Sequence, residues 1–265
     1  MLVKSNLMQS FDGIIEHRHL LKSLIYRNLF GRYKNSVLGF AWNFVTPTIM
    51  LIVYIIAFSE FRAATLPNYW LFIASGLYPF NFMISNLVGG TTAVTSNSNL
   101  IKKIYFPREI LVLSQVISSF IVMLIGYIIV IMAAQIAGRG LNPNHIGMFL
   151  IILILMFFFV LGYVFLLSAI TVYLRDIQYI LGSINMLFFF LTPMYFVARD
   201  ATGLLGKIIW FNPFTYYIES FHQMLYYGVM PDMHYVMVCA ILPIFSISIG
   251  LLIFRHLKKG FAERL

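Results

Sequence analysis

Charged residues are scarce in this chain: Asp, Glu, Lys and Arg make up only 10% of its 265 residues, whereas 61% are hydrophobic. Soluble domains contain about 25% charged residues. A single core of a chain this short cannot bury so much apolar surface, so most of that surface must face lipid. The composition therefore predicts an integral membrane protein. Membrane topology explains the net charge of +9 better than nucleic-acid binding does.

Acidic residues are the rarest charged type, with nine in the whole chain, and none lies in the middle of an apolar run. Ion-coupled carriers and proton relays usually need a charged group within the membrane, so the sequence argues against both. His17 and His19 are two residues apart and would not share a helix face, and we predict no metal site. His222 near Glu219 favours a polar pair over a catalytic one, because no nucleophile accompanies it, and we predict no catalytic residues.

The chain also lacks a disulfide and a phosphate-binding loop. Its one cysteine, Cys239, permits no internal disulfide. The stretch "GLLGKI" lacks the earlier glycine that a phosphate-binding loop requires, and it has Ile208 in the place of Ser or Thr. If transport is active, its energy would therefore come from another chain.

Long apolar runs are abundant, and six of them are long enough for a helix to cross a bilayer, which takes about 20 residues. They cover approximately residues 37–58, 70–92, 110–136, 147–173, 178–198 and 234–257. With both termini in the cytoplasm, fourteen of the 18 Lys and Arg residues fall on the inner side, as the positive-inside rule requires. We therefore predict an all-α integral membrane protein with one domain, 1–265, and six transmembrane helices.

Three segments lie outside these spans. Residues 1–35 place apolar side chains at helical spacing among basic ones, which predicts an amphipathic helix on the inner membrane surface. Residues 93–109, the inner loop, carry a short basic helix that either docks a cytoplasmic partner or only anchors the loop by its positive charge. In residues 199–232, the outer segment, Asn212 and Pro213 begin one of two predicted short interfacial or re-entrant helices.

Aromatic residues make up 17% of the chain, and most of them would serve membrane-interface belts and packing. Tyr78, Phe80, Phe82, Tyr195, Phe196 and Trp210 gather in or near the two spans that Pro79 and Pro193 interrupt. Stacking against sugar rings is one use of such a cluster, and the predicted tunnel set drawn from it also takes in Trp42 of the first span. Plain packing is the alternative that the residues leave open. The set comprises Trp42, Tyr78, Phe82, Tyr195, Phe196 and Trp210.

Several motifs resemble those of one membrane-protein family. The stretch "RNLFGRYKNSVLGFAWNFVTP" is similar to the start of permeases in the polysaccharide and lipopolysaccharide branch of type 2 ABC exporters, with its basic–Tyr–Lys pattern followed by Ser-x-Leu-Gly-x-x-Trp and Pro. "IKKIYFPREILVLSQ", "YLRDIQYIL", "LTPMYF" and "WFNPFTYYIESFHQMLYYG" resemble later elements of that family, in the same order. The chain departs from the pattern after Leu111, where no proline follows, and at His222, where relatives often carry arginine.

The resemblance implies a transport subunit that exports a lipid-linked polysaccharide, such as O-antigen, capsule or teichoic acid, across the inner membrane. It implies two copies of this chain and two copies of a cytoplasmic ATP-binding subunit. That subunit would hold ATP and magnesium, so no cofactor is expected on this chain. Membrane lipid would surround the chain, no nucleic acid would be bound, and the outer segment would act as an exit gate.

The resemblance also implies roles for individual residues. The inner loop and the turn after the fourth span would contact the ATP-binding subunit, through Lys102, Lys103, Phe106, Pro107, Arg108, Glu109, Arg175 and Asp176. A portal for the pyrophosphate head group of the substrate would comprise Arg27, Arg32, Tyr33, Lys34, Ser36, Leu38 and Gly39. The aromatic set would line the tunnel.

Three other functions remain open at this point. The aromatic set and "RYKNSVLG" argue against an exporter of drugs or small lipids from the same superfamily. The missing carboxylates and metal motifs argue against an integral-membrane enzyme that acts on polyprenyl-phosphate sugars. The polar, proline-interrupted second span argues against a purely structural membrane scaffold.

Overall fold

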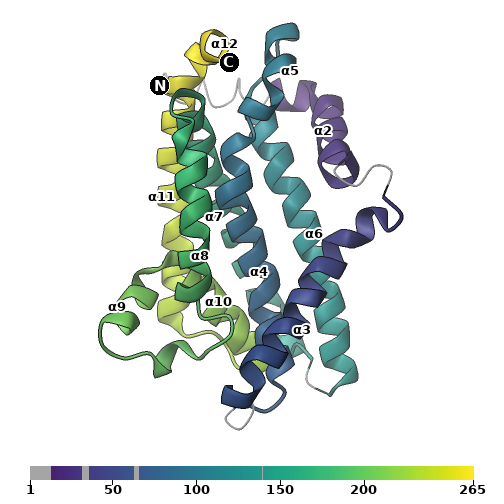
Figure 1. Ribbon diagram of the computed structural model, residues 1–265, viewed down its shortest axis with the longest axis vertical. Helices are drawn as coiled ribbons and strands as arrows, with labels where there is room; N and C mark the ends of the chain where they lie inside the picture. Colours follow the sequence, from purple (N-terminus) through teal and green to yellow (C-terminus); the bar gives the residue numbers. More distant parts are fainter. Residues whose placement is uncertain (1–12, 32–35, 63–65, 139) are drawn as a thin grey trace.

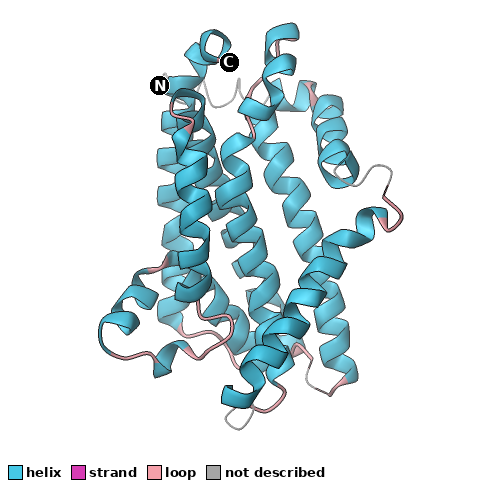
Figure 2. Cartoon of the chain, in the orientation of Figure 1, coloured by secondary structure: helices cyan, strands magenta, loops and turns pink. Residues whose placement is uncertain are grey.

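The computed structural model describes residues 13–31, 36–62, 66–138 and 140–265, and these residues form helices and connecting turns, with no strand among them (Figures 1 and 2). The prediction of an all-α chain is therefore confirmed. The principal helices are α2 (Arg18–Phe30), α3 (Trp42–Arg62), α4 (Tyr69–Gly89), α5 (Ser98–Lys103), α6 (Glu109–Ile136), α7 (Ile146–Tyr173), α8 (Asp176–Leu191), α9 (Gly203–Phe211), α10 (Pro213–Phe221), α11 (Met233–Leu257) and α12 (Phe261–Arg264).

Five of the predicted spans are confirmed as helical segments long and apolar enough to cross a membrane. They cover Gly39–Phe58, Tyr69–Thr92, Glu109–Ile136, Pro143–Tyr173 and Met233–Gly260 in the part of the chain that the structure describes. Their positions agree with prediction because a continuous apolar helix satisfies its own backbone polar groups in lipid.

The prediction of a sixth span at 178–198 is not confirmed. Helix α8 has 16 residues and ends at Leu191, which gives it a length of about 24 Å. The reason is local: Pro193 disfavours helical geometry at the residue before it, and Thr192 accordingly has extended dihedrals, φ −106° and ψ 126°. Helix α8 nevertheless runs beside α7 from the end that carries α12 toward α9 and α10 (Figure 1).

Helix α4 forms the centre of the bundle. Of its most apolar window, 83% is buried, whereas none of the corresponding window of α3 is. Burial explains why α4 is the least hydrophobic of the five spans, since its polar groups face protein and not lipid. Ser75 donates to the carbonyl oxygen of Phe72 at 2.7 Å, and Asn86 donates to the hydroxyl of Ser119 at 2.8 Å.

Helices α7 and α11 pack closely through small residues. A Cβ atom added at Gly162 would lie 2.3 Å from the backbone of Ser246, and one added at Gly250 would lie 2.1 Å from the carbonyl oxygen of Gly162. Small residues let transmembrane helices approach until van der Waals contacts form along the backbones. These two helices therefore form a closely packed pair, the α7–α11 unit.

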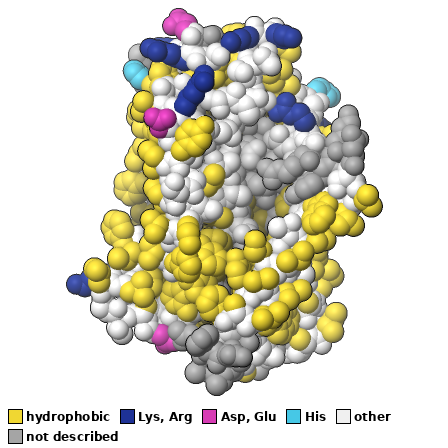
Figure 3. Space-filling view, in the orientation of Figure 1, with side chains coloured by type: hydrophobic (Ala, Val, Ile, Leu, Met, Phe, Trp, Pro, Cys, Tyr) yellow, Lys and Arg dark blue, Asp and Glu magenta, His cyan; other side chains and the backbone are white. Residues whose placement is uncertain are grey.

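The two ends of the molecule differ in charge. Lys and Arg side chains gather at the end that carries α5 and α12, and hydrophobic side chains cover much of the opposite half (Figure 3). Helices α9 and α10 lie near the other end (Figure 1). The predicted 1–35 helix is described from Gly13 onward; α2 packs against α6 and buries Leu24, while its position on a membrane surface stays a prediction.

Candidate functional site

A cleft of about 550 Å³ lies between α2, α3, α4 and α6. Helix α2 contributes Arg27 and Asn28, and α3 contributes Trp42 and Thr46. Polar side chains and aromatic rings both line the cleft. It brings together residues that the sequence analysis had assigned to two separate functions, the portal and the tunnel.

The wall from α4 combines aromatic rings with amide and hydroxyl groups. Tyr78 and Phe82 are almost fully buried, with 6% and 2% of their surfaces exposed, and Asn81 and Ser85 lie beside them on the cleft. The ring of Tyr78 lies flat against α6, where a Cβ atom on Gly126 would be 2.1 Å from its Cε1. Gly126 therefore allows the aromatic ring to pack directly on the neighbouring backbone.

The wall from α6 was missed in the sequence analysis. Gln115, Ser118 and Ser119 line the cleft from one face of this helix. Ser118 donates to the carbonyl oxygen of Ser114 at 2.7 Å, and Ser119 donates to that of Gln115 at 3.1 Å. The signal was available: three polar residues at i, i+3 and i+4 in an apolar helix share one face.

Of the predicted portal residues, exposed Arg27 lines the mouth of the cleft, and Ser36 contacts the cleft residue Trp42. The guanidinium of Arg27 donates to Asn97 Oδ1 at 2.6 Å, and the indole of Trp42 donates to Ser36 Oγ at 3.1 Å. Leu38 is exposed, and Gly39 has a φ of +47°, a left-handed conformation that favours glycine. The other three portal residues, Arg32, Tyr33 and Lys34, lie outside the described residues.

The six aromatic residues of the predicted tunnel do not form one cluster within the chain. Trp42, Tyr78 and Phe82 line the cleft, whereas Tyr195 and Phe196 line a second hollow of about 510 Å³ beside α8 and α9. The ring of Tyr195 stacks on Phe58 at 4.7 Å between ring centroids. The sixth, Trp210, stacks on Tyr235 at 5.6 Å.

The inner loop divides into exposed and buried residues. Lys102, Lys103, Arg175 and Asp176 are exposed, whereas Phe106 is 5% exposed. Pro107 and Arg108 are half-buried, and the Glu109 carboxylate pairs with Lys258 inside the protein.

Tyr105 is the most exposed aromatic residue of the inner loop, at 95%. Sequence reasoning missed it as a candidate contact, although an aromatic ring within the basic "KKIYFP" stretch was the available signal. Aromatic side chains are enriched at protein–protein interfaces, so exposed Tyr105 is suited to contact with another protein.

The outer segment contains the two short helices that were predicted, α9 and α10. Asn212 caps α10 as expected, accepting from the backbone N–H of Phe214 at 3.0 Å, with Pro213 in the first turn. Desolvation by burial raises the pKa of Tyr216, so its phenol stays protonated and donates to the carbonyl oxygen of Trp210 at 2.8 Å. The placement of these helices relative to a membrane stays a prediction.

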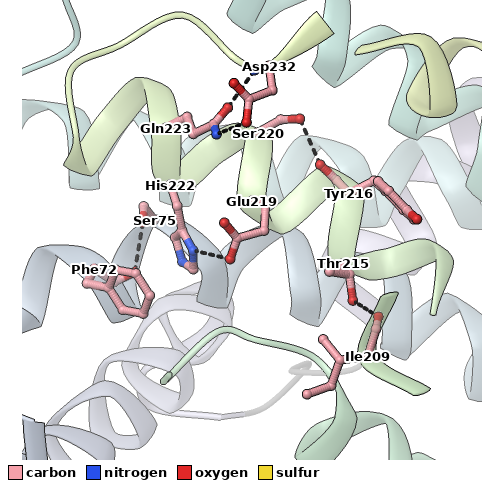
Figure 4. Close-up of polar contacts among 10 residues, drawn as sticks. All are labelled: Phe72, Ser75, Ile209, Thr215, Tyr216, Glu219, Ser220, His222, Gln223 and Asp232. Carbon is pink, nitrogen blue, oxygen red and sulfur yellow. Dashed lines mark hydrogen bonds and ion pairs between the residues drawn. The ribbon is translucent and has the colours of Figure 1, made fainter. Parts of the chain in front are cut away.

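Several polar contacts join residues within the outer segment to one another (Figure 4). Asp232 accepts from Arg199 at 2.6 Å and from Gln223 at 3.1 Å. Glu219 Oε1 lies 3.6 Å from His222 Nδ1, and both side chains are buried. Among the described residues, no three His, Cys, Asp or Glu side chains are grouped in a way that would hold a metal ion.

The sequence matches the ABC-2 type transporter family over residues 19–226. The chain belongs to this family. It is 28% identical over 261 residues to the O-antigen export system permease protein RfbA of Klebsiella pneumoniae, covering 98% of each chain. It is 27% identical over 253 residues to the protein of the same name from Myxococcus xanthus, covering 94% of this chain and 96% of that one. It is 25% identical over 219 residues to the capsule polysaccharide export inner-membrane protein CtrC of Neisseria meningitidis serogroup B, covering 80% of each.

Family membership confirms the resemblance drawn from the motifs and makes this ABC-2 chain a multi-pass membrane transport subunit. The matched region begins in α2 and ends at the π-helical turn His222–Tyr226. It therefore contains every residue that lines the cleft, together with the inner loop and α10. Helices α11 and α12 of this ABC-2 chain lie beyond it.

Proposed function

We propose that this ABC-2 permease exports a lipid-linked polysaccharide of the O-antigen or capsule kind across the inner membrane. The energy comes from ATP hydrolysis on a separate cytoplasmic subunit. The relatives named as O-antigen and capsule export proteins support this assignment, and they span most or all of the chain.

The composition of the cleft is the observation that carries the proposal. At its mouth Arg27 supplies a guanidinium, which forms paired hydrogen bonds with phosphate oxygens. In the same cleft, Asn81 and Gln115 offer amide groups to sugar hydroxyls, and Trp42 offers an aromatic face to sugar rings. A pyrophosphate followed by sugars needs these three kinds of group.

A small-molecule or drug exporter is a weaker fit to the cleft. Pockets for such ligands are predominantly apolar, with only a few polar groups. This cleft has polar side chains from each of its four helices, namely Asn28, Thr46, Asn81 and Ser118.

The assembly we propose has two copies of this chain and two ATP-binding subunits, related by twofold symmetry. Helices α3 and α8 support the second copy, because they expose apolar side chains such as Ile52, Val53, Met186 and Leu187. The end that carries α5 and α12 faces the cytoplasm in this arrangement, because Lys and Arg gather there. The outer segment is then the exit gate on the opposite side.

Deletion of the gene in its own host tests the proposal. Surface glycan is labelled on intact cells and total glycan on permeabilised cells, with the wild-type gene restored on a plasmid as the control. Loss of surface glycan with polymer retained inside the cell supports export. Unchanged surface glycan contradicts it and favours the small-molecule exporter, and loss of glycan from both compartments favours an enzyme of synthesis.

A further inference from the structure

The segment after α11, residues 258–264, closes over the start of α6. Lys258 Nζ lies 2.5 Å from Glu109 Oε1, and the guanidinium of Arg108 donates to the backbone carbonyl oxygen of Lys258. Glu109 is the first residue of α6 and Lys258 the first residue after α11. Residues that are 149 positions apart in the sequence therefore join the inner loop to the end of the last long helix.

Burial of the carboxylate makes loss of its partner costly. The side chain of Glu109 is 4% exposed and that of Lys258 is 31% exposed. The second carboxylate oxygen of Glu109 has no hydrogen-bond partner among the described residues. Lys258 is therefore the positively charged partner of a carboxylate that is buried away from solvent. Separating the two groups would leave an uncompensated buried charge, which is the costly way to break such a pair.

Aromatic packing fixes the 258–264 segment to α7 and α11. Phe261 is fully buried, 5.5 Å from the ring of Phe254, and the guanidinium of Arg108 lies 5.6 Å above the Phe261 ring. On the other side Tyr173 donates to the carbonyl oxygen of Leu257 at 2.9 Å. A Cβ atom at Gly260 would lie 2.4 Å from the Tyr173 hydroxyl, so the segment and the end of α7 are in direct contact.

We propose that the Glu109–Lys258 pair is a relay that carries movement of the inner loop to the α7–α11 unit; this inference rests on the proposed function. Helix α6 packs with α2 and α4, lines the cleft and also contacts α7, and α11 packs along α7. When a cytoplasmic subunit displaces the exposed loop at Tyr105, Glu109 moves with it. Lys258 must follow the buried carboxylate, so both groups of helices tilt together. Glu109 and Lys258 are positioning residues and touch neither substrate nor nucleotide.

The test compares charge-removal, conservative and charge-exchange variants of the pair in the complete transporter. Four permease variants are made, Glu109→Gln, Lys258→Met, Lys258→Arg and the charge exchange Glu109→Lys with Lys258→Glu. Lys259→Met is the matched control, because it removes one exposed lysine from the adjacent position. Each is measured for membrane insertion, co-purification with the ATP-binding subunit, ATP hydrolysis, and glycan exported per ATP hydrolysed.

The relay predicts that Lys258→Met and Glu109→Gln insert, bind the ATP-binding subunit and hydrolyse ATP, while glycan exported per ATP falls about fivefold or more, the range of ordinary coupling between sites. Lys258→Arg and the charge exchange should recover most of that ratio, and Lys259→Met should keep it. An unchanged ratio in both single variants overturns the relay. Loss of binding to the ATP-binding subunit also overturns it, because the pair would then serve docking.

Failure of the variants to insert, and failure of the proposed function itself, must each be told apart from failure of the relay. If the single variants fail to insert, the charge exchange decides: an inserted protein with the wild-type ratio supports the relay, and one with a low ratio contradicts it. If the wild-type gene itself restores no surface glycan in the deletion strain, the proposed function fails, and that result is distinct from failure of the relay.

Discussion

The imidazole of His222 stacks on the ring of Phe72, with 4.0 Å between ring centroids and an interplanar angle of 26° (Figure 4). This contact joins the outer segment to the central helix α4. His222 is fully buried, and its ring nitrogens have no hydrogen-bond partner among the described residues apart from the 3.6 Å approach to Glu219. The histidine that replaces the family's frequent arginine is therefore a packing residue in the core of the outer segment.

The space that His222 occupies depends on Gly76. A Cβ atom at Gly76 would lie 2.9 Å from His222 Nε2 and 3.2 Å from Met194 Cβ. We expect Gly76→Ala to destabilise the protein by about 1–3 kcal/mol, the usual cost of overpacking, and to lower the unfolding temperature of the purified chain. Gly89→Ala in the same helix is the control, because its Cβ would meet no described atom within 4 Å. Equal unfolding temperatures for the two variants would contradict this account of the contact.

The polar wall of the cleft should matter for polymer movement. Replacing Asn81 by leucine keeps the approximate volume but removes hydrogen bonds to sugar hydroxyls, and we expect export to fall about two- to tenfold, the effect of one hydrogen bond. The measurement is the rate at which labelled glycan reaches the surface of cells in a deletion strain. Ile128→Leu, an exposed apolar position on α6, is the control. A wild-type rate for the Asn81 variant would assign that residue to packing.

Arg27 should act on the head group of the substrate. Arg27→Gln removes the positive charge at the cleft mouth, and we expect glycan to accumulate inside the cell while the permease level is unchanged. Arg27→Lys should be intermediate, because lysine keeps the charge but lacks the paired donors of the guanidinium. Arg18→Gln removes an exposed arginine from the same helix and should leave export normal. If Arg27→Gln and Arg18→Gln give the same export, the assignment of Arg27 to the head group is wrong.

Alanine variants of Tyr105 and Phe106 should have different defects, one in binding to the ATP-binding subunit and the other in stability. Tyr105 is exposed, so Tyr105→Ala should weaken co-purification with the ATP-binding subunit without changing the stability of the permease. Phe106 is buried, so Phe106→Ala should destabilise the loop by about 3–5 kcal/mol, the cost of a large-to-small change in a core.

Pull-down of the ATP-binding subunit and thermal unfolding of the permease separate these two effects. Phe211→Ala, at an exposed aromatic residue in α9 on the opposite half of the molecule, should change neither quantity. If the Tyr105 variant binds the ATP-binding subunit normally, the docking surface does not include Tyr105 and lies elsewhere at the end that carries α5 and α12.

Part of the candidate site was predictable from local sequence. Trp42, Tyr78 and Phe82 were predicted as members of one aromatic set, and they line one cleft, while their role in a tunnel stays a prediction. Gln115, Ser118 and Ser119 were missed although their spacing places them on one face of α6. Tyr195 and Trp210 were grouped with the first three, yet the turn at Thr192 and Pro193 directs the chain away from the cleft. Aromatic residues that lie near proline-interrupted spans in the sequence need not lie near one another in the folded chain.

The sequence by itself determined the class of protein, the positions of five spans and the start of α10, because these follow from hydropathy and from capping over a few residues. Tertiary structure alone decided that the inner loop is held by Lys258, that His222 stacks on Phe72, and that four helices share one cleft. Those contacts join residues as far apart in the sequence as Phe72 and His222 or Glu109 and Lys258. Their free energy comes from burial and packing between helices, so no periodicity within a single helix encodes them.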